Sequence, residues 1–184
     1  MHIDTAALIR KCQEGDTEAY GQLVMCYSDY LFSIVFRLVN DEQYAEDLVQ
    51  DAFVKAWQNI GKYNPSKSKF TTWLHTIGTR LSLDWMKKQK RWANMDELKV
   101  ADKTWCKQET DDLVNKELGQ MIQEACRLLS PQQKTIFVLR DLESMEVSEV
   151  IAITGYSEKK IKDNLYVARQ KVRQQLEIYL KSEV

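Results

Sequence analysis

Apolar residues recur every three or four positions along most of this chain, which is the spacing of one face of an α-helix. The C-terminal segment repeats this spacing most regularly. Its apolar residues are Ile161, Leu165, Ala168, Val172, Leu176 and Tyr179. No segment keeps up the alternation of apolar and polar residues that marks a half-buried strand. The pattern therefore predicts an all-α protein.

Capping residues and helix breakers divide the first half of this pattern into separate helices. Asp4 and Asp16 each precede an apolar-periodic stretch, and Gly15 separates the two stretches. Asn40 and Asp41 interrupt the pattern again, and the Asn-Pro pair and serines within 62–69 indicate a loop. We predict helices over about 5–14, 16–39, 42–61 and 70–91.

The helical pattern fades between positions 94 and 111 and resumes with Val114. This interruption predicts two small helical domains, 1–93 and 112–184, joined by a flexible linker over 94–111. In the second domain, Ser130 and Gln133 form a capping box around Pro131, so a new helix begins there and runs to about Leu142.

The last two predicted helices form a helix-turn-helix pattern. A short helix over about 147–154 stops at Gly155, and Ser157 caps a long helix that reaches about Leu180. Basic residues gather in the first part of the long helix. Such a helix can enter the DNA major groove, although an ordinary amphipathic surface helix shares this spacing.

Composition limits the classes of protein that fit. With 184 residues, of which 44% are hydrophobic, the chain can form one ordinary domain or two small ones with packed cores. The net charge of −1 gives no nucleic-acid signal for the whole chain. Basic residues instead cluster at 87–91 and between Lys159 and Arg173, which predicts two separate places that meet phosphate.

The chain shows no signal for a membrane, a metal site or an active site. We find no apolar stretch near the length of a bilayer helix and no secretory signal, so we expect a cytoplasmic protein without membrane insertion. The cysteines and histidines are scattered, so we expect no metal and no cofactor. They are Cys12, Cys26, Cys106, Cys126, His2 and His75. No nucleophile constellation or phosphate-cradling glycine loop points to an enzyme.

The predicted third helix has an acidic stripe opposite its apolar face. The stripe comprises Asp47, Gln50, Asp51 and Gln58, with Val54 inside it. An acidic stripe around one exposed apolar residue fits a basic partner, and a solvated helix face has the same pattern.

Three tracts resemble the sigma-70 family of RNA polymerase sigma factors. Residues 44–57 read YAEDLVQDAFVKAW, residues 70–84 read FTTWLHTIGTRLSLD ahead of the basic 87–91, and residues 129–140 read LSPQQKTIFVLR. Their order and separation match the family over nearly the whole chain. The small size is similar to that of the extracytoplasmic-function group, which keeps only the second and fourth sigma domains.

The resemblance implies three partners and a division of labour. The first tract would bind core RNA polymerase through Asp47, Gln50, Asp51, Val54 and Gln58, against the clamp helices of its largest subunit. The other two partners would be promoter DNA and an anti-sigma factor. The second tract would recognise and melt the −10 element, because extruded bases need polar edge contacts and stacking surfaces. The −10 candidates are Tyr63, Asn64, Ser68, Lys69, Trp73, Arg80, Lys87, Lys88, Lys90 and Arg91.

Trp73 has two interpretations at this stage. Its indole is either a stacking surface for a base or part of the apolar stripe that includes Phe70, Leu74, Ile77 and Leu81.

The resemblance also implies that the last helix reads the −35 element, although its sequence departs from the family pattern. The −35 candidates are Ser157, Lys159, Lys160, Lys162, Asp163, Asn164, Tyr166, Arg169 and Arg173. Asp163 and Asn164 replace a usual serine and arginine, Val167 replaces a usual arginine, and Ile151 stands where the family often has alanine. Asp163 can accept a hydrogen bond from cytosine or repel phosphate.

Two other functions remain open. A stand-alone DNA-binding regulator would explain the helix-turn-helix but would leave the first two tracts without a role. A sigma-like protein that only sequesters core polymerase or an anti-sigma factor would explain the departures at Asp163 and Asn164.

Overall fold

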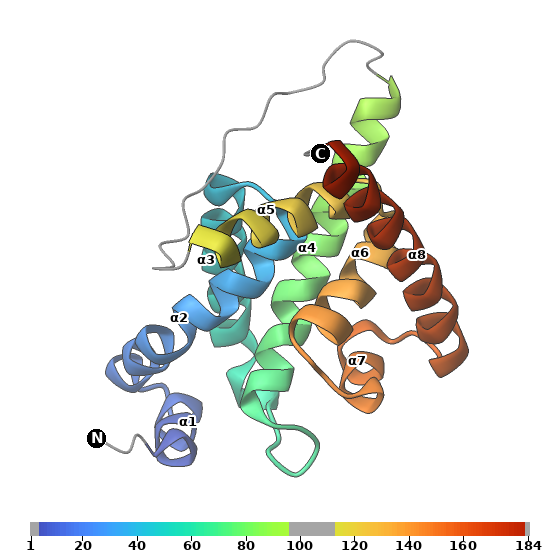
Figure 1. Ribbon diagram of the computed structural model, residues 1–184. Coiled ribbons are helices and arrows are strands. Elements are labelled where there is room, and N and C mark those ends of the chain that lie inside the picture. The colour runs from blue at the N-terminus through green and yellow to red at the C-terminus, as the bar shows by residue number, and fades with distance from the viewer. Residues whose placement is uncertain (1–3, 96–112, 183–184) are drawn as a thin grey trace.

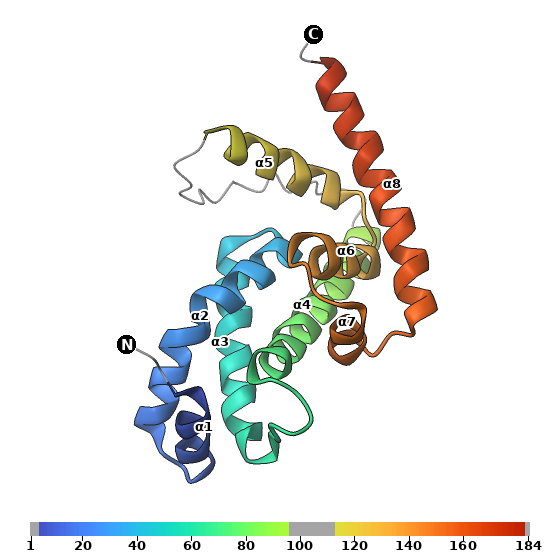
Figure 2. The same ribbon diagram turned by 60° about the horizontal axis from the view of Figure 1, so that its bottom comes forward.

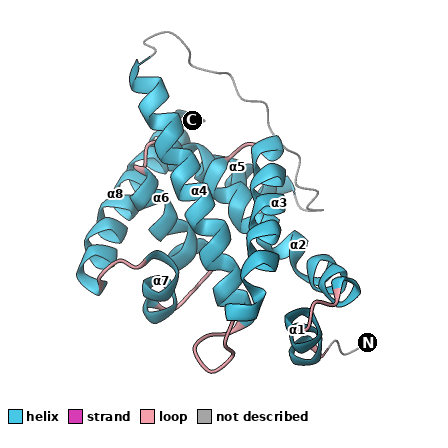
Figure 3. Ribbon diagram, turned by 180° about the vertical axis from the view of Figure 1, so that it is seen from behind, coloured by secondary structure: helices cyan, strands magenta, loops and turns pink. Residues whose placement is uncertain are grey.

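The computed structural model describes residues 4–95 and 113–182, and every regular element within these ranges is a helix (Figures 1 and 3). The predicted all-α class is therefore confirmed. The N-terminal half (residues 4–95) contains α1 (Thr5–Gln13), α2 (Thr17–Val39), α3 (Glu42–Asn59), the 3₁₀ turn η1 (Ile60–Lys62) and α4 (Phe70–Met95). The C-terminal half (residues 113–182) contains α5 (Leu113–Arg127), α6 (Pro131–Phe137), the π-helical turn η2 (Val138–Leu142), α7 (Val147–Thr154) and α8 (Glu158–Ser182).

Side-chain caps fix the helix starts that the sequence predicts. The Asp4 carboxylate accepts hydrogen bonds from the backbone N–H groups of Ala6 and Ala7, each over 3.1 Å. Ser130 Oγ accepts from the backbone N–H of Gln133 over 3.3 Å, and the Gln133 side chain accepts from the Ser130 N–H over 3.1 Å. These contacts satisfy donors that a helix start leaves free.

Left-handed residues end two of the helices. Asn40 closes α2 at φ 57°, and Gly155 closes α7 at φ 71°. Glycine and asparagine reach this backbone region at the lowest cost, so each residue sets the turn that follows its helix.

Two predicted boundaries differ from the structure. Helix α4 runs to Met95 rather than to about Arg91, so Asn94 and Met95 belong to it. The helix after Ser130 changes into the π turn η2 at Val138. The rest of the predicted linker, 96–111, lies outside the described residues, so the domain limits 1–93 and 112–184 stay a prediction.

Helix α2 forms the centre of the N-terminal half. It packs against α1, α3 and α4 and buries Leu31, Ile34 and Leu38 completely. Gly78 of α4 makes a close crossing possible, because a Cβ atom there would lie 2.8 Å from Leu31 Cδ1. Packing against α2 therefore fixes the position of α4.

The apolar character of α2 bears on the expectation that no continuous apolar stretch spans a membrane. Among the described helices, α2 is long and apolar enough to cross a membrane, by length and composition only. The structure explains this apolar character, because α2 contacts other helices on several sides. Its apolar residues serve the core of the N-terminal half.

The two halves pack against each other along α4. Figure 2 shows α4 between α2 and α3 on one side and α6 and α7 on the other. Arg37 of α2 forms an ion pair with Glu143, which directly follows η2. The helix-turn-helix therefore contacts the N-terminal half directly.

Candidate functional site

The acidic stripe of α3 forms an exposed surface, here called the docking face (Asp47, Gln50, Asp51, Val54 and Gln58). All five side chains are exposed, and Val54 is 55% exposed. The opposite side of α3 is buried in the core through Leu48, Val49, Ala52, Phe53 and Ala56. Because that packing fixes the rotation of α3, the docking face presents fixed carboxylates around one apolar residue.

The loop between η1 and α4 is organised around Tyr63. Its ring is only 6% exposed and lies 5.7 Å from the Phe70 ring and 5.3 Å from the Trp73 ring, centroid to centroid. Its hydroxyl donates to the Ser68 carbonyl over 2.9 Å. Tyr63 therefore holds the loop against the core, and in this structure it offers no ring face for stacking, which corrects the expectation for this residue.

The rest of this loop is open to solvent. Asn64 and Lys69 are exposed, Ser68 is half-buried, and the Asn64 side chain accepts from the Ser66 backbone N–H over 2.9 Å. The polar groups of the loop therefore face solvent, and hydrogen bonds from Tyr63 and to Asn64 hold its backbone in place.

Trp73 combines both of its sequence interpretations. It is half-buried against the core, and it also lines a groove of about 340 Å³ between α3 and α4. The groove residues are Lys55, Asn59, Lys62, Trp73, Ile77, Arg80, Leu81 and Asp84. An indole beside three cations and an amide suits a base together with its phosphate.

The basic end of α4 continues from this groove. Lys87, Lys88, Lys90 and Arg91 are exposed, and Lys87 contacts Asp84 over 3.4 Å. The structure thus aligns the groove and the basic run along one helix.

Helix α8 presents its first turns outward, while Ile161, Leu165, Ala168 and Val172 are buried. Ser157 Oγ caps the helix by accepting from the Lys160 backbone N–H over 3.3 Å. Lys159, Asp163 and Tyr166 are exposed, and Tyr166 is 67% exposed. This exposed face matches the one that the sequence pattern predicts.

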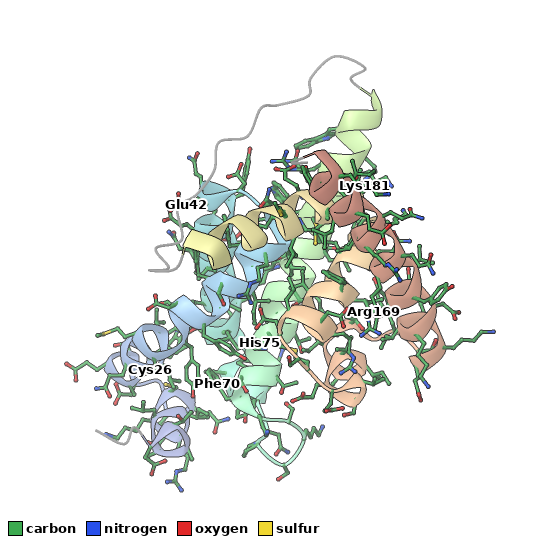
Figure 4. All side chains as sticks on the ribbon, in the orientation of Figure 1. Cys26, Glu42, Phe70, His75, Arg169 and Lys181 are labelled. Atoms are coloured by element: carbon green, nitrogen blue, oxygen red, sulfur yellow. The ribbon has the colours of Figure 1, made fainter. Side chains whose placement is uncertain are left out.

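Most cations of α8 already have partners within the chain. Arg169 donates two hydrogen bonds to the Asp141 carboxylate, over 2.8 and 2.6 Å, and Figure 4 labels Arg169 on α8. Three further cations of α8 are engaged as well. Lys162 pairs with Glu158 over 2.6 Å, and Arg173 pairs with Glu177 over 2.8 Å. The Lys160 ammonium lies 4.0 Å from the Tyr156 ring centroid. Asn164 donates to the Lys160 carbonyl over 2.8 Å.

Comparison with known proteins finds sigma factors that are similar to this chain. The family model Sigma-70 region 2 matches residues 23–92. The chain is 27% identical over 180 residues to the ECF RNA polymerase sigma factor SigW of Bacillus subtilis (strain 168), covering 91% of this chain and 94% of that protein. It is 29% identical over 158 residues to the RNA polymerase sigma factor SigV of the same organism, covering 84% and 90%. Over most of its length, the chain is therefore similar to sigma-70 family sigma factors of the extracytoplasmic-function group.

Sigma factors are transcription initiation factors and not enzymes. Among solved structures, the chain resembles the sigma factor RpoE in complex with the anti-sigma factor NepR from Bartonella quintana. The TM-score is 0.66 at 23% identity, covering 86% of this chain and 97% of that chain, so this likeness concerns the fold.

The structure adds residues to these surfaces that the sequence reasoning missed. Lys55, Asn59 and Lys62 line the groove beside Trp73. Their spacing of four and three residues is the signal that could have found them, because it continues one helix face. Trp92, which is 60% exposed directly after the basic run of α4, was also missed.

Within the described ranges, no cluster of three or more His, Cys, Asp or Glu side chains could hold a metal ion.

Proposed function

We propose that this chain is a sigma factor that binds core RNA polymerase through the docking face and directs it to promoters that carry −10 and −35 elements. The docking face itself carries the proposal. Exposed carboxylates around Val54, on a helix whose other side is buried, suit a basic protein surface better than they suit DNA. A stand-alone DNA-binding regulator has no use for such a face.

The −10 element would meet the loop 62–69 and the groove beside Trp73. Melted DNA needs a stacking surface and polar contacts, and Trp73, Asn64 and Arg80 supply them. Lys69 and Ser68 flank the loop, and Lys87, Lys88, Lys90 and Arg91 would bind the phosphates of the strand. Tyr63 supports this surface from below instead of touching a base.

The −35 element would meet the first turns of α8. Lys159, Asp163 and Tyr166 point outward and can reach base edges, with Asn164 and Lys160 beside them. Lys162 and Arg173 can turn to phosphate by leaving their acidic partners, since exposed ion pairs contribute little stability. Arg169 would have to give up two hydrogen bonds to the Asp141 carboxylate to do the same. Ser157 sets the helix N-terminus, whose partial positive charge faces the DNA.

An anti-sigma factor is the third proposed partner. The support is the structural likeness to RpoE, which was solved with the anti-sigma factor NepR. Partnership with core polymerase and promoter DNA also implies that this sigma factor acts in the cytoplasm.

Run-off transcription with purified core polymerase tests the proposal. Promoter-specific transcripts should appear only when the chain is added. Specific DNA binding that needs no core would favour the stand-alone regulator, and core binding without transcripts would favour the sequestering protein.

A further inference from the structure

A cavity of about 430 Å³ lies where the end of α5 and the start of α6 meet α4 and α8. Helix α6 packs against both α4 and α8 and lies between them (Figures 1 and 2). This volume falls in the range of about 300–1,000 Å³ that is typical of small-molecule sites. The cavity shares no lining residue with the docking face or with the groove beside Trp73. It is therefore a separate feature of the molecule.

The charged residues that line this cavity are all basic. They are Lys90, Arg127, Lys134 and Lys171, and none of the described residues that line the cavity is acidic. Arg127 pairs with Glu124 over 3.0 Å, and Lys90 belongs to the exposed basic run of α4. Lys134 and Lys171 have no acidic partner within the described ranges. The cavity thus holds positive charge that the chain leaves uncompensated.

Lys134 differs from the other three cations because it is buried. Its side chain belongs to a residue that is only 8% exposed, and in the described part of the chain no hydrogen bond or ion pair engages its ammonium. Burial lowers the pKa of Lys134 to about 8; the Cys126 thiol acts in the opposite direction, and Arg127 acts with burial. A buried cation costs free energy unless an anion accompanies it. An anion in the cavity would offset this cost.

Lys171 contacts neutral acceptors only. Its ammonium donates to the Leu128 carbonyl over 3.4 Å and to Gln133 Oε1 over 3.3 Å. Both hydrogen bonds are long, and hydrogen bonds to a charged acceptor are roughly twice as strong as those between neutral groups. An anion in the cavity would therefore gain Lys171 as a donor at little cost.

The helices of the N-terminal half give the cavity an apolar wall. Helix α2 contributes Leu38 and Val39, and α4 contributes Trp85 and Met86. Trp85 is half-buried, and its ring lies 5.0 Å from the Tyr44 ring, centroid to centroid. A flat apolar group can pack against such a held aromatic ring. The cavity therefore suits a ligand that combines an anionic group with a flat apolar part.

We propose that this cavity binds a phosphorylated small molecule of nucleotide size, with its phosphate at Lys134 and Lys171 and its ring against the apolar wall. A phosphomonoester carries a charge of about −1.5 to −2 at pH 7, which two uncompensated ammonium groups match better than they match a single carboxylate. The site goes beyond the proposed function, because it needs neither polymerase nor promoter DNA.

Isothermal titration calorimetry on the full-length chain tests the site, with adenosine 5′-monophosphate as the probe. The wild type should bind this probe with a Kd below about 1 mM. Adenosine lacks the phosphate and ribose 5-phosphate lacks the ring, so each should bind at least about 5-fold more weakly. A short duplex DNA without promoter elements should not compete, because a duplex cannot reach the buried Lys134.

Charge-removing variants identify the cations that hold the phosphate. Lys134→Met and Lys171→Met should each weaken binding of the probe at least about 10-fold, because each removes a charged donor. Lys181→Met removes the same charge from the exposed end of α8, so it is the matched control and should bind like the wild type. Without ligand, Lys134→Met should melt about 2 °C or more above the wild type, because it removes an uncompensated buried charge.

Four results would overturn the proposal. No binding of the probe to the wild type, or equal binding of adenosine or ribose 5-phosphate, would contradict the assigned ligand class. Wild-type affinity in Lys134→Met would place the phosphate on exposed cations elsewhere. A lower melting temperature of Lys134→Met would show that Lys134 stabilises the fold instead of awaiting an anion. Competition by the duplex DNA would assign the cations of the cavity to nucleic acid.

Discussion

The acids of the docking face on α3 and the cations of α8 differ in how their charges are engaged. In the part of the chain that the structure describes, no hydrogen bond or ion pair engages the side chains of Asp47 and Asp51. On α8, Lys162, Arg169 and Arg173 are each paired with an acid of the same chain. If the proposed function holds, the docking face is ready for its partner, whereas these α8 cations must exchange internal partners for phosphate.

The largest expected effect concerns the docking face. Asp51→Arg should weaken core polymerase binding by at least about 100-fold, because it places a cation opposite a basic partner. The free energy of unfolding should change by less than about 0.5 kcal/mol, since Asp51 is exposed. A pull-down with core, with Asp29→Arg as control, measures the affinity. Normal affinity of Asp51→Arg would show that the docking face lies elsewhere.

The next effect concerns the pH dependence of stability that arises from His75, which is buried on α4. Burial lowers the pKa of His75 to about 4, whereas an exposed histidine has a pKa of about 6.5. Between pH 4 and pH 6.5 the histidine is protonated in the unfolded chain but neutral in the folded chain. The contribution of neutral His75 to the free energy of unfolding is therefore complete above pH 6.5 and is lost as the pH falls toward 4. The full loss is about 3 kcal/mol.

Urea unfolding across this pH range measures the effect. The acidic and phenolic groups that face His75, Glu149 and Tyr30, are kept unchanged. His75→Gln should remove this part of the pH dependence. Parallel stability curves for the wild type and His75→Gln would contradict the assigned burial.

A smaller effect is expected on α8. Lys160→Ala combined with Lys162→Ala should weaken −35 DNA binding and lower the salt slope by up to about two. The change should fall below that limit, since Lys162 already pairs with Glu158 and Lys160 with the Tyr156 ring. Lys181→Ala, near the far end of α8, is the control. An unchanged slope in the double variant would place the DNA on another face.

The smallest effect distinguishes the structural role of Tyr63 in the loop 62–69 from the proposed DNA contact of Trp73. Tyr63→Phe removes the hydroxyl that donates to the Ser68 carbonyl and should lower the free energy of unfolding by about 1 kcal/mol. Promoter melting, followed by permanganate reactivity, should persist in Tyr63→Phe and fall in Trp73→Ala. Lost melting at unchanged stability in Tyr63→Phe would instead assign Tyr63 to the DNA.

Local patterns predicted much of this molecule. Asp4, Ser130 and Gly155 act at short range through caps and turns, so their helix boundaries follow from neighbouring residues. The docking face could be predicted because the buried and exposed sides of an amphipathic helix repeat with helical period in its sequence. The family resemblance then predicted that this face binds core polymerase.

Long-range packing explains what the sequence did not predict. His75, Thr79 and Ser82 are polar types that resemble surface residues, yet they are buried where α4 packs against helices of both halves. Tyr63 lies in a loop, and its ring is buried through contact with the rings of Phe70 and Trp73. The Arg169–Asp141 pair joins positions 28 residues apart, which no helical periodicity relates.

Mapping transcript 5′ ends after induced expression tests most directly whether the protein directs polymerase to promoters by binding it through the docking face. The wild type should create a set of new start sites that share two upstream elements, and Asp51→Arg at equal abundance should create none. The same new start sites with Asp51→Arg, or no new start sites with the wild type, would contradict the proposed function.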